Sequence, residues 1–448
     1  MKELLLLKTM PRALKLYHFY KKKEFASKEE IRAYQFERLR KLINHSWHNI
    51  PFYRKYWTQN GFSPELFKEL DDLRKIPPID RDVIRNNPDS LLSLSARTQK
   101  LKLTTTGGTT GMPLKFYIDQ RISIPKEAAA LYDLFRRFKY KPFARCLFLE
   151  GSRLDESLIR KGIYWKRNYL RNGLVMSSFH LNDNTIHKYV KKIREFNPHY
   201  IFAYPSSSTV LCRLMKKNGL PAFKSLKHVI CSSENIYDWH RELVQEVLGV
   251  KIFSQYGHSE KCVIAGECEH SSNLHFSPYY GYTELINASG TPCTREGEKG
   301  EIVVTGFDQK DFVFIRYRTG DLAEYTSKAC ACGRNHFTVR KIVGREQDFV
   351  VDRKGDLRIF TCSDEIFWEI PPKVNAYQYV QRIKGELELR VEVNEALTVE
   401  DYEVLRKRLS ELLVDFPVSI SEVCHIPRTK SGKFKYLVQK IPLKNRRG

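Results

Sequence analysis

The chain has 448 residues and a formal net charge of +24, from 76 Lys and Arg against 52 Asp and Glu. Its 42% apolar and 29% charged residues suit a soluble globular protein, and only 10 Cys are present, which excludes disordered, collagen-like and disulfide-stapled chains. No run of about 18 apolar residues occurs, so no integral membrane segment is expected. The charge attracts anions such as nucleotides, nucleic acid or acidic lipid without selecting one.

The N-terminus predicts an amphipathic helix rather than a cleaved signal. The leucine run 4–7 is too short for a signal core, and Arg12 and Lys15 follow at once. The protein is therefore expected in the cytoplasm with reduced thiols, where clustered Cys indicates metal rather than disulfide. The leucine run and the basic surface permit peripheral membrane association without requiring it.

Two helices are predicted in the first hundred residues, over 27–48 and 64–76. Ser27 can cap the first, and apolar residues recur in it at helical spacing. Beyond residue 100, short apolar runs at 146–149 and 200–203 alternate with helical patterns, which predicts an α/β sheet. The helices expected in that region span 184–195, 206–217 and 238–248.

From 273 to 350 the sequence pattern becomes typical of β-strands. Strands are predicted at 301–305, 312–315 and 349–351. A smaller α+β unit of about 100 residues follows, with a strand at 386–393 and a helix at 398–413. The predicted fold class is therefore α/β and α+β, with a large N-terminal part and a small C-terminal one.

Glycine and threonine are densest in residues 103–113, Leu-Thr-Thr-Thr-Gly-Gly-Thr-Thr-Gly-Met-Pro. Glycines let a backbone approach a ligand and turn N–H groups toward an anion, and threonine hydroxyls add donors. The segment is not a Walker A loop, because no Gly-Lys-Ser/Thr occurs in it. Composition alone favours a phosphate cradle and a flexible surface turn equally.

Two further segments place a charge beside glycine. Residues 314–321 lead an apolar run into a Gly turn, which is expected to place Asp321 at a strand end, where its carboxylate can accept hydrogen bonds from both ribose hydroxyls. Residues 427–433 carry Lys433 on a loop, from which it can reach into a site and neutralise charge on a phosphate. An ordinary Gly-Asp turn and an exposed basic loop are the alternatives.

Taken in this order, the three segments resemble the adenylate-forming superfamily of acyl-CoA synthetases, peptide-synthetase adenylation domains and luciferases. Ser254–Glu260 is similar to its Tyr-Gly-x-Ser/Thr-Glu element, and Val343–Asp348 to its Gly-Arg-x-x-Asp element. Ser232–Glu234 stands where the family has Gly-Gly-Glu or Gly-Ala-Glu. Pro51–Arg54 and Ala203–Ser206 resemble the phenylacetate-CoA ligases and their capsule-biosynthesis relatives. The resemblance covers nearly the whole chain.

The resemblance implies an N-terminal adenylation domain over 1–344, a hinge at 345–348 and a mobile C-terminal domain over 349–448. It implies activation of a small carboxylic acid by ATP, with release of pyrophosphate, and transfer of the acyl group to CoA. Glu260 would bind Mg²⁺ and Lys433 would stabilise the adenylation transition state, so these two are the expected catalytic residues. The residues expected to contact ATP are Thr104, Thr105, Thr106, Gly107, Gly108, Thr109, Ser233, Glu234, Tyr256, Gly257, His258, Ser259, Asp321 and Arg345.

The chain departs from the family pattern at three places, one of which is Gln347, where the family often has a charged hinge residue. Ser232-Ser233 replaces the usual glycine pair of the adenine turn, and 351–356 replaces a Gly-rich run that faces the second substrate. The acceptor is therefore left open between CoA, a carrier thiol, and an amine or sugar of capsule or O-antigen polysaccharide synthesis.

The cysteines suggest a metal site in the β-rich part, at about 262–340. Cys268 precedes His275 by a Cys-x₆-His spacing, and Cys330 and Cys332 follow about 55 residues later. Three Cys and one His suit a structural, tetrahedral zinc, because four protein ligands leave no open position for catalysis. The phenylacetate-CoA ligase-like branch has a similar arrangement. His270 and Cys262 are competing ligands, and unmetallated thiols are the alternative.

Two other classes of function are alternatives. A non-catalytic nucleotide-binding protein would not need to retain Glu260, Asp321, Arg345 and Lys433 together. A zinc-containing nucleic-acid binder would explain the charge and the cysteines. However, no helix-turn-helix, zinc-finger spacing or interleaved aromatic and basic face appears, so no specific nucleic-acid partner is expected.

Overall fold

The computed structural model describes residues 2–105, 114–152, 154–345, 349–355, 357–360, 364–367, 370, 373–413, 416–428 and 435–441. The chain forms two compact units. Unit 1 comprises Met1–Pro142 and Ser254–Val343, and unit 2 comprises Phe143–Phe253 and Gly344–Gly448. The hinge at 345–348 stays a prediction. Within the described residues, no helix is both long and apolar enough to span a bilayer.

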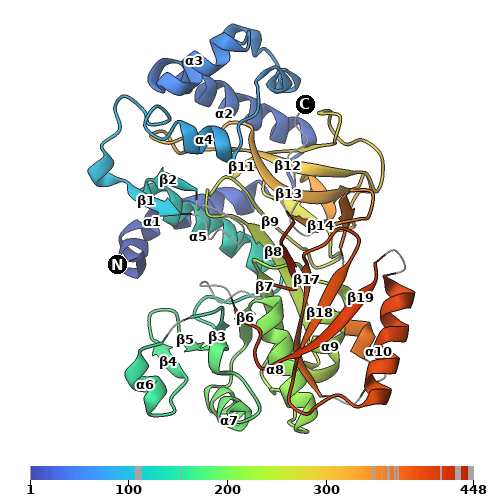
Figure 1. Cartoon of the computed structure of the whole chain (residues 1–448). Coiled ribbons are helices and arrows are strands. Elements are labelled where there is room, and N and C mark those ends of the chain that lie inside the picture. Colours follow the sequence, from blue (N-terminus) through green and yellow to red (C-terminus); the bar gives the residue numbers. More distant parts are fainter. Residues whose placement is uncertain are drawn as a thin grey trace. The chain divides into compact units, whose positions relative to one another are not determined.

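Helices make up the first part of unit 1 (Figure 1). They are α1 (Lys2–Lys22), α2 (Lys28–Asn49), α3 (Pro51–Gln59), α4 (Arg81–Asn86) and α5 (Gln120–Arg136), with the 3₁₀ turns η1 (Pro64–Leu66), η2 (Leu70–Lys75) and η3 (Thr98–Lys100). The predicted helix over 27–48 is confirmed as α2, and Ser27 and Glu30 form a reciprocal capping box at its start. Helices α1 and α5 lie side by side.

The single helix predicted over 64–76 is wrong. The chain forms η1 and η2 there instead, separated by Phe67 at φ −93° and ψ 86°. The carboxylate of Asp72 accepts the backbone N–H groups of Lys68 and Glu69 at 2.8 and 2.9 Å. This local side-chain capture competes with the i to i−4 bonds of a continuous helix.

The strands of unit 1 are β1 (Lys102–Thr105), β2 (Lys115–Ile118), β8 (Lys251–Gly257, whose last part belongs to this unit), β9 (Ile264–Gly266), β10 (Leu274–Phe276), β11 (Gly281–Ile286), β12 (Lys299–Gly306), β13 (Tyr317–Tyr325) and β14 (Thr338–Arg345). Strands β1 and β2 form an antiparallel pair, and the others follow the order β11-β12-β13-β14-β10-β9-β8. Alternate apolar residues of these strands, such as Ile302 and Val304, face a core shared with α2 and α3.

The strand predicted at 312–315 is also wrong. This segment is buried but irregular, and only Phe312 makes an isolated bridge, to Leu92. The hydroxyl of Tyr53 on α3 donates to the carbonyl of Val313 and accepts from the N–H of Ile315 at 2.8 and 3.1 Å. The segment thus has side-chain partners in place of a sheet ladder.

Unit 2 contains the predicted α/β sheet. Its strands β3 (Cys146–Leu149), β4 (Trp165–Asn168), β5 (Gly173–Met176), β6 (Tyr200–Ala203) and β7 (His228–Ser232) follow the order β7-β6-β3-β5-β4. All pairs are parallel except β4 with β5, and β4 is the edge strand. Helices α6 (Glu156–Arg160), α7 (Ile186–Phe196), α8 (Pro205–Lys217) and α9 (Asp238–Leu248) and the turn η4 (Ser178–His180) connect them. The helices predicted in this region are confirmed as α7, α8 and α9.

The C-terminal part of unit 2 is the predicted α+β layer. Strands β17 (Val374–Gln381), β18 (Leu387–Val393), β19 (Val418–Val423) and β20 (Leu437–Gln439) form a sheet in the order β19-β18-β17-β20. Helix α10 (Val399–Leu412) packs Leu405 and Leu409 into its core. Strands β15 (Phe349–Val351) and β16 (Leu357–Ile359) pair separately, and η5 (Asp364–Phe367) precedes β17.

Candidate functional site

Glu260 is the most strongly organised carboxylate among the predicted site residues. Its side chain is 4% exposed in the turn after β8, and Nδ1 of His258 lies 3.2 Å from its Oε2. The hydroxyl of Tyr317 on β13 donates to its Oε1 at 3.0 Å. Burial alone would raise the pKa of Glu260, but the charge of His258 and these contacts outweigh it and lower the pKa to about 2. The carboxylate is therefore ionised throughout the physiological range.

Tyr317 and Arg81 were not predicted as site residues. Burial raises the pKa of Tyr317, so its hydroxyl stays protonated and can donate. Nε of Arg81, at the first turn of α4, donates to the same hydroxyl at 3.3 Å. Tyr317 lies four positions before Asp321, within the motif already recognised, but nothing local to Arg81 links it to this motif.

Asp321 and Tyr256 form a second contact between the same two segments of unit 1. The hydroxyl of Tyr256, on β8, donates to Oδ2 of Asp321 at 2.8 Å. Asp321 is 7% exposed, and its N–H donates to the hydroxyl of Thr319 at 3.0 Å. Segments 256–260 and 317–321 are thus joined side chain to side chain at two points, although β8 and β13 are not neighbours in the sheet.

The position of Asp321 corrects the expected strand end. Asp321 lies inside β13, just after Gly320, which has φ +75°. The β12–β13 register shifts between Glu301, which pairs with Leu322, and Val303, which pairs with Arg318. A bulge with glycine in the left-handed region re-aims the side chains beside it, so the carboxylate is presented from within a strand.

Ser233 and Glu234, which are expected at the adenine, lie in unit 2. Ser233 has φ 73°, in the left-handed region that favours glycine, at the position where the family places one. The Glu234 carboxylate accepts from the N–H and the hydroxyl of Ser206 at 2.9 and 3.0 Å. Ser206 lies in the first turn of α8, where the helix dipole favours a negative charge.

Arg428 approaches this turn from the 427–433 segment. Its Nη1 lies 3.4 Å from the hydroxyl of Ser206 and donates to it. Burial lowers the pKa of Arg428, and the nearby Glu234 opposes that effect. The sequence pattern of this segment pointed to Lys433, and Arg428 had no predicted role.

The described residues include only some of the other residues that are predicted to contact ATP. Thr104 and Thr105 end β1, with Thr105 opposite Lys115 of β2, so residues 106–113 connect two paired strands. Thr106, Gly107, Gly108, Thr109 and Lys433 lie outside the described residues. Gly257 ends β8, Ser259 follows it half-buried, and Arg345 is the last residue of β14.

The four predicted metal ligands converge in unit 1. The ligand atoms of Cys268, His275, Cys330 and Cys332 all lie within 4.8 Å of one another. Sγ of Cys268 is 3.5 Å from Sγ of Cys330, and Sγ of Cys332 is 3.9 Å from Nε2 of His275. Zn–S bonds of about 2.3 Å in a tetrahedron place sulfurs about 3.8 Å apart, so the donors fit zinc.

The imidazole of His275 is in the form that binds metal. Burial lowers the pKa of His275 to about 4, with a smaller contribution from nearby arginines, so the ring is neutral at physiological pH. The competing ligands have other contacts: the backbone N–H of His270 donates to Sγ of Cys268, and Sγ of Cys262 donates to the carbonyl of Glu260.

A buried ion-pair network adjoins the cysteine cluster. The guanidinium of Arg334, two residues after Cys332, donates to Glu24 at 2.6 and 2.8 Å and to Glu269 at 3.0 Å. Arg136 on α5 also pairs with Glu24, so one carboxylate near the end of α1 binds two guanidinium groups. Burial would raise the pKa of Glu24, but the two arginines outweigh it and lower the pKa.

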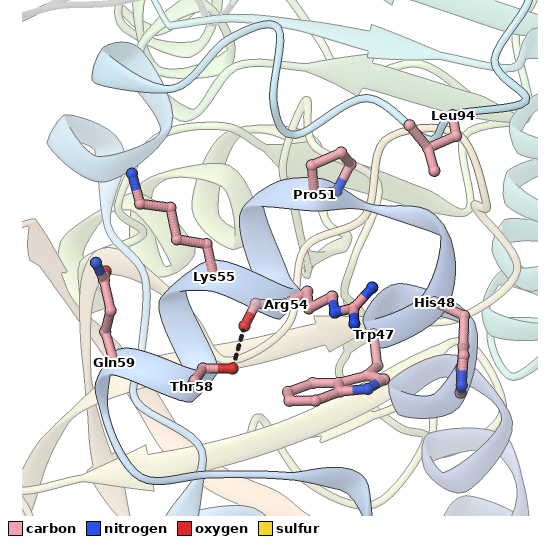
Figure 2. Close-up of a pocket in the computed structure, with 8 residues that line it drawn as sticks. All are labelled: Trp47, His48, Pro51, Arg54, Lys55, Thr58, Gln59 and Leu94. Atoms are coloured by element: carbon pink, nitrogen blue, oxygen red, sulfur yellow. Dashed lines mark hydrogen bonds between the residues drawn. The ribbon is translucent and has the colours of Figure 1, made fainter.

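Each unit contains a cavity lined by described residues. Figure 2 shows the one in unit 1, of about 460 Å³, lined by Trp47, His48, Pro51, Arg54, Lys55, Thr58, Gln59 and Leu94. Among these residues, the hydroxyl of Thr58 donates to the carbonyl of Arg54 one turn earlier in α3, at 2.8 Å. The cavity in unit 2, of about 820 Å³, is lined by both basic and acidic side chains, among them Arg213, Glu242 and Arg428. Neither cavity is lined by a predicted site residue.

Comparison with known proteins agrees with the resemblance predicted from the sequence. The chain is 29% identical over 391 residues to a phenylacetate-coenzyme A ligase of Thermus thermophilus, covering 83% of each chain. It is 24% identical to the protein CapK of Staphylococcus aureus, covering 95% of this chain and 93% of CapK. It is 26% identical to the phenylacetate-coenzyme A ligase of Escherichia coli, covering 91% of this chain and 94% of that protein. No family model matches the chain.

Solved structures agree on the fold. The structure of a 2-hydroxyisobutyryl-CoA ligase in the postadenylation state aligns with a TM-score of 0.73 at 18% identity, covering 93% of this chain and 91% of that one. An anthranilate CoA ligase in complex with anthranoyl-AMP aligns with a TM-score of 0.51 at 15% identity, covering 83% and 75%. The fold is that of adenylate-forming ligases, and the resemblance predicted from the sequence is confirmed.

Proposed function

We propose that this chain, which has the fold of adenylate-forming ligases and sequence similarity to phenylacetate-CoA ligases, is an AMP-forming acid–thiol ligase. Its first step activates a small carboxylic acid with ATP, and its second transfers the acyl group to CoA. The observation that carries the proposal is the pair of contacts between segments 256–260 and 317–321, Tyr256 with Asp321 and Tyr317 with Glu260. Because both contacts join the same two segments of unit 1, they connect Asp321, which is expected at the ribose, with Glu260, which is expected at the phosphates.

The first half-reaction forms an oxygen–phosphorus bond. A carboxylate oxygen of the acid attacks the α-phosphorus of ATP, the bond to the bridging oxygen breaks, and pyrophosphate leaves with the electron pair. Because nucleophile and target are both anionic, catalysis is a matter of positioning and charge neutralisation. The Gly- and Thr-rich segment beside β1 would hold the phosphates, and Lys433 would stabilise the transition state.

The ionised carboxylate of Glu260 is suited to hold Mg²⁺, a cation that prefers oxygen ligands and supplies charge neutralisation at phosphates when bound. His258 and Tyr317 orient that carboxylate. Asp321, whose orientation is fixed by Tyr256, would accept the ribose hydroxyls, and Glu234 with Ser233 would border the adenine. Arg345 would support the ribose or the phosphates.

The second half-reaction forms a thioester. The thiolate of CoA attacks the acyl carbonyl of the adenylate, a C–S bond forms, the C–O bond to phosphate breaks, and AMP leaves. Two observations support CoA as the acceptor: the phenylacetate-coenzyme A ligases among the relatives, and the coverage of 83% of each chain.

A second acceptor class is an amine or sugar. The similarity to CapK spans 95% of this chain, more than is aligned with the Thermus ligase, and CapK carries no CoA-ligase name. The activation step would be the same in both cases, and only the nucleophile that attacks the acyl-adenylate would differ.

We also propose that Cys268, His275, Cys330 and Cys332 bind one structural Zn²⁺. Three thiolates and one imidazole fill the tetrahedron, so this ion would hold β9 and β10 to the segment after β13 rather than take part in the reaction. The mutual distances of the donors and the neutral imidazole support this role.

The test is ATP–pyrophosphate exchange with Mg²⁺ over a panel of aryl-acetic, benzoic, short aliphatic, hydroxy and amino acids. Exchange with one acid identifies the donor, and CoA or an amino sugar added afterwards identifies the acceptor. Lys433→Ala should lower exchange by about a hundredfold or more and spare thioester formation from a preformed acyl-adenylate. Lys430→Ala, three residues earlier, is the matched control and should retain both.

The outcomes separate the two parts of the proposal. Exchange without thioester formation would keep adenylation and reject CoA. Absence of both exchange and ATP binding in zinc-replete, folded protein would reject the enzyme itself. Equal loss of both half-reactions in Lys433→Ala would reject the role given to that lysine.

A further inference from the structure

The two most exposed large apolar side chains of the described residues lie at one edge of unit 2. Tyr169 is 82% exposed and Phe143 is 77% exposed, and Leu170, beside Tyr169, is 57% exposed. Tyr169 and Leu170 form the turn between β4 and β5, and β4 is the edge of the sheet. Single exposed apolar residues are ordinary, but a group of this kind indicates an interaction surface.

Two hydrogen bonds donated by Asn172 join the backbone of Phe143 to that of the hairpin turn. Nδ2 of Asn172 donates to the carbonyl of Phe143 at 2.7 Å, and its N–H donates to the carbonyl of Tyr169 at 3.1 Å. Phe143 and Asn172 both have positive φ, 57° and 42°, which costs free energy for residues other than glycine. These bonds bring the backbone of Phe143 close to the turn that carries Tyr169 and Leu170, at a conformational cost.

Basic side chains surround this apolar group. Lys166, Arg167 and Arg171 are exposed on the hairpin itself. Arg167 lies over the rings of Tyr169 and Phe196, at 5.4 and 4.5 Å. Residues 155–196, which include the hairpin, α6 and α7, contain nine Lys and Arg against four Asp and Glu. We call Phe143, Lys166, Arg167, Tyr169, Leu170 and Arg171 the hairpin patch.

We propose that the hairpin patch docks the protein on an anionic lipid surface. Aromatic and leucine side chains at a projecting turn can enter the boundary between headgroups and acyl chains, while flanking Lys and Arg side chains reach anionic headgroups. Each basic residue near such a surface contributes about a fivefold gain in affinity, so the three basic residues of the hairpin should together strengthen membrane binding substantially.

The chemistry of the patch favours lipid over other anionic or apolar partners. Single-stranded nucleic acid binds along a groove with aromatic platforms, whereas this patch lies on a turn and lines neither the 460 Å³ nor the 820 Å³ cavity. A second copy of the chain would bring Lys and Arg against Lys and Arg in a self-complementary contact, which is unfavourable at low salt.

The experiment is flotation of the full-length protein with vesicles of phosphatidylglycerol and phosphatidylcholine in equal parts, against phosphatidylcholine alone. We expect binding to the anionic vesicles only, weakened as NaCl rises from about 0.05 to about 0.5 M. Phe143→Asn with Leu170→Asn removes the apolar group and keeps a residue at 143 that tolerates positive φ. Lys166→Glu with Arg171→Glu reverses the charge. Each double variant should lower binding at least about tenfold.

Matched controls lie elsewhere in unit 2. Ile383 is 60% exposed between β17 and β18, and Lys407 is exposed on α10. Ile383→Asn and Lys407→Glu should bind vesicles as the unaltered protein does. All variants should keep the same melting temperature and ATP–pyrophosphate exchange, because none of these residues belongs to the proposed catalytic machinery. A variant that melts early is replaced by its single substitutions.

Three results would overturn the proposal. The first is absence of flotation with anionic vesicles. The second is retention of flotation in both double variants. The third is a double variant that loses self-association or RNA retention but keeps its flotation, even if the other double variant does not. This result would assign the patch to a second copy or to nucleic acid.

Discussion

The hydroxyl of Tyr256 donates a 2.8 Å hydrogen bond to Oδ2 of Asp321, joining two strands that are not sheet neighbours. Asp321 is buried, and this contact helps to hold its carboxylate in one orientation. A hydrogen bond to a charged group is among the stronger ones in a folded protein.

Tyr256→Phe should therefore weaken ATP binding more than it weakens folding. We expect the KM for ATP to rise about fivefold to tenfold and the melting temperature to fall by about 2 °C, because one charge-assisted hydrogen bond is lost without a large cavity. Pyrophosphate exchange at varied ATP concentrations measures the first quantity. Tyr282→Phe on β11 of the same unit is the control; an equal rise in KM there would contradict a specific role for Tyr256.

The lowered pKa of Glu260 predicts how the free energy of unfolding depends on pH. Its pKa is lowered from an ordinary value of 4.5 to about 2 in the folded chain, so its contribution is fully present above pH 4.5 and is lost as pH falls toward 2. The contribution is about 3 kcal/mol in all, of which about 1 to 1.5 kcal/mol disappears between pH 6 and pH 3.5.

Urea unfolding of the protein and of Glu260→Gln at both pH values measures this difference. The gap in free energy of unfolding between the two proteins should be larger at pH 6 than at pH 3.5. A gap that does not change with pH would mean that the carboxylate is not ionised preferentially in the folded state.

Ser233→Gly should stabilise unit 2. Ser233 has φ 73°, which costs a residue with a Cβ about 1 kcal/mol, and glycine removes this cost. The melting temperature should rise by about 2 °C with the KM for ATP unchanged within about twofold. Ser232→Gly, at the end of β7, is the matched control and should lower stability by about 0.5 to 1 kcal/mol. Destabilisation by both would argue against strain at Ser233.

Metal content tests the cysteine cluster. We expect about one zinc per chain by elemental analysis, lost in Cys330→Ser or after prolonged treatment with a chelator, together with a lower melting temperature. Cys424→Ser, at an exposed cysteine of unit 2, should retain the metal. Unaltered protein without zinc after purification and zinc supplementation would mean that the four donors remain three thiols and an imidazole without a metal.

Local patterns predicted the fold well where the cause was local. Ser27 and Glu30 are three residues apart and mark the start of α2 correctly. Residues 64–76 carry a helical pattern too, but the capture of two backbone N–H groups by Asp72 is a competing local bond that periodicity does not register. The bulge at Gly320 escaped prediction for a related reason: a register shift depends on the partner strand.

The candidate site was predicted as a set of motifs, not as a set of contacts. Cys268, His275, Cys330 and Cys332 could be named together because thiol and imidazole spacing is distinctive. Arg81 could not be linked to Tyr317, 236 positions away, since a single arginine after a proline-rich turn carries no such signal. Long-range pairs of common residue types follow from the folded topology alone.

Glu24 gives the beginning of the chain an unexpected importance. It is the shared anion for Arg136 and Arg334, and Arg334 follows the last cysteine of the cluster by two positions. A chain shortened to begin at Ser27 would remove the carboxylate that Arg136 and Arg334 share, leaving Asp133 and Glu269 as their remaining partners, and should therefore be less stable. Removing the segment before Ser27 to obtain a minimal enzyme would therefore weaken the ion pairs beside the cysteine cluster, where Arg334 lies more than three hundred positions later in the chain than Glu24.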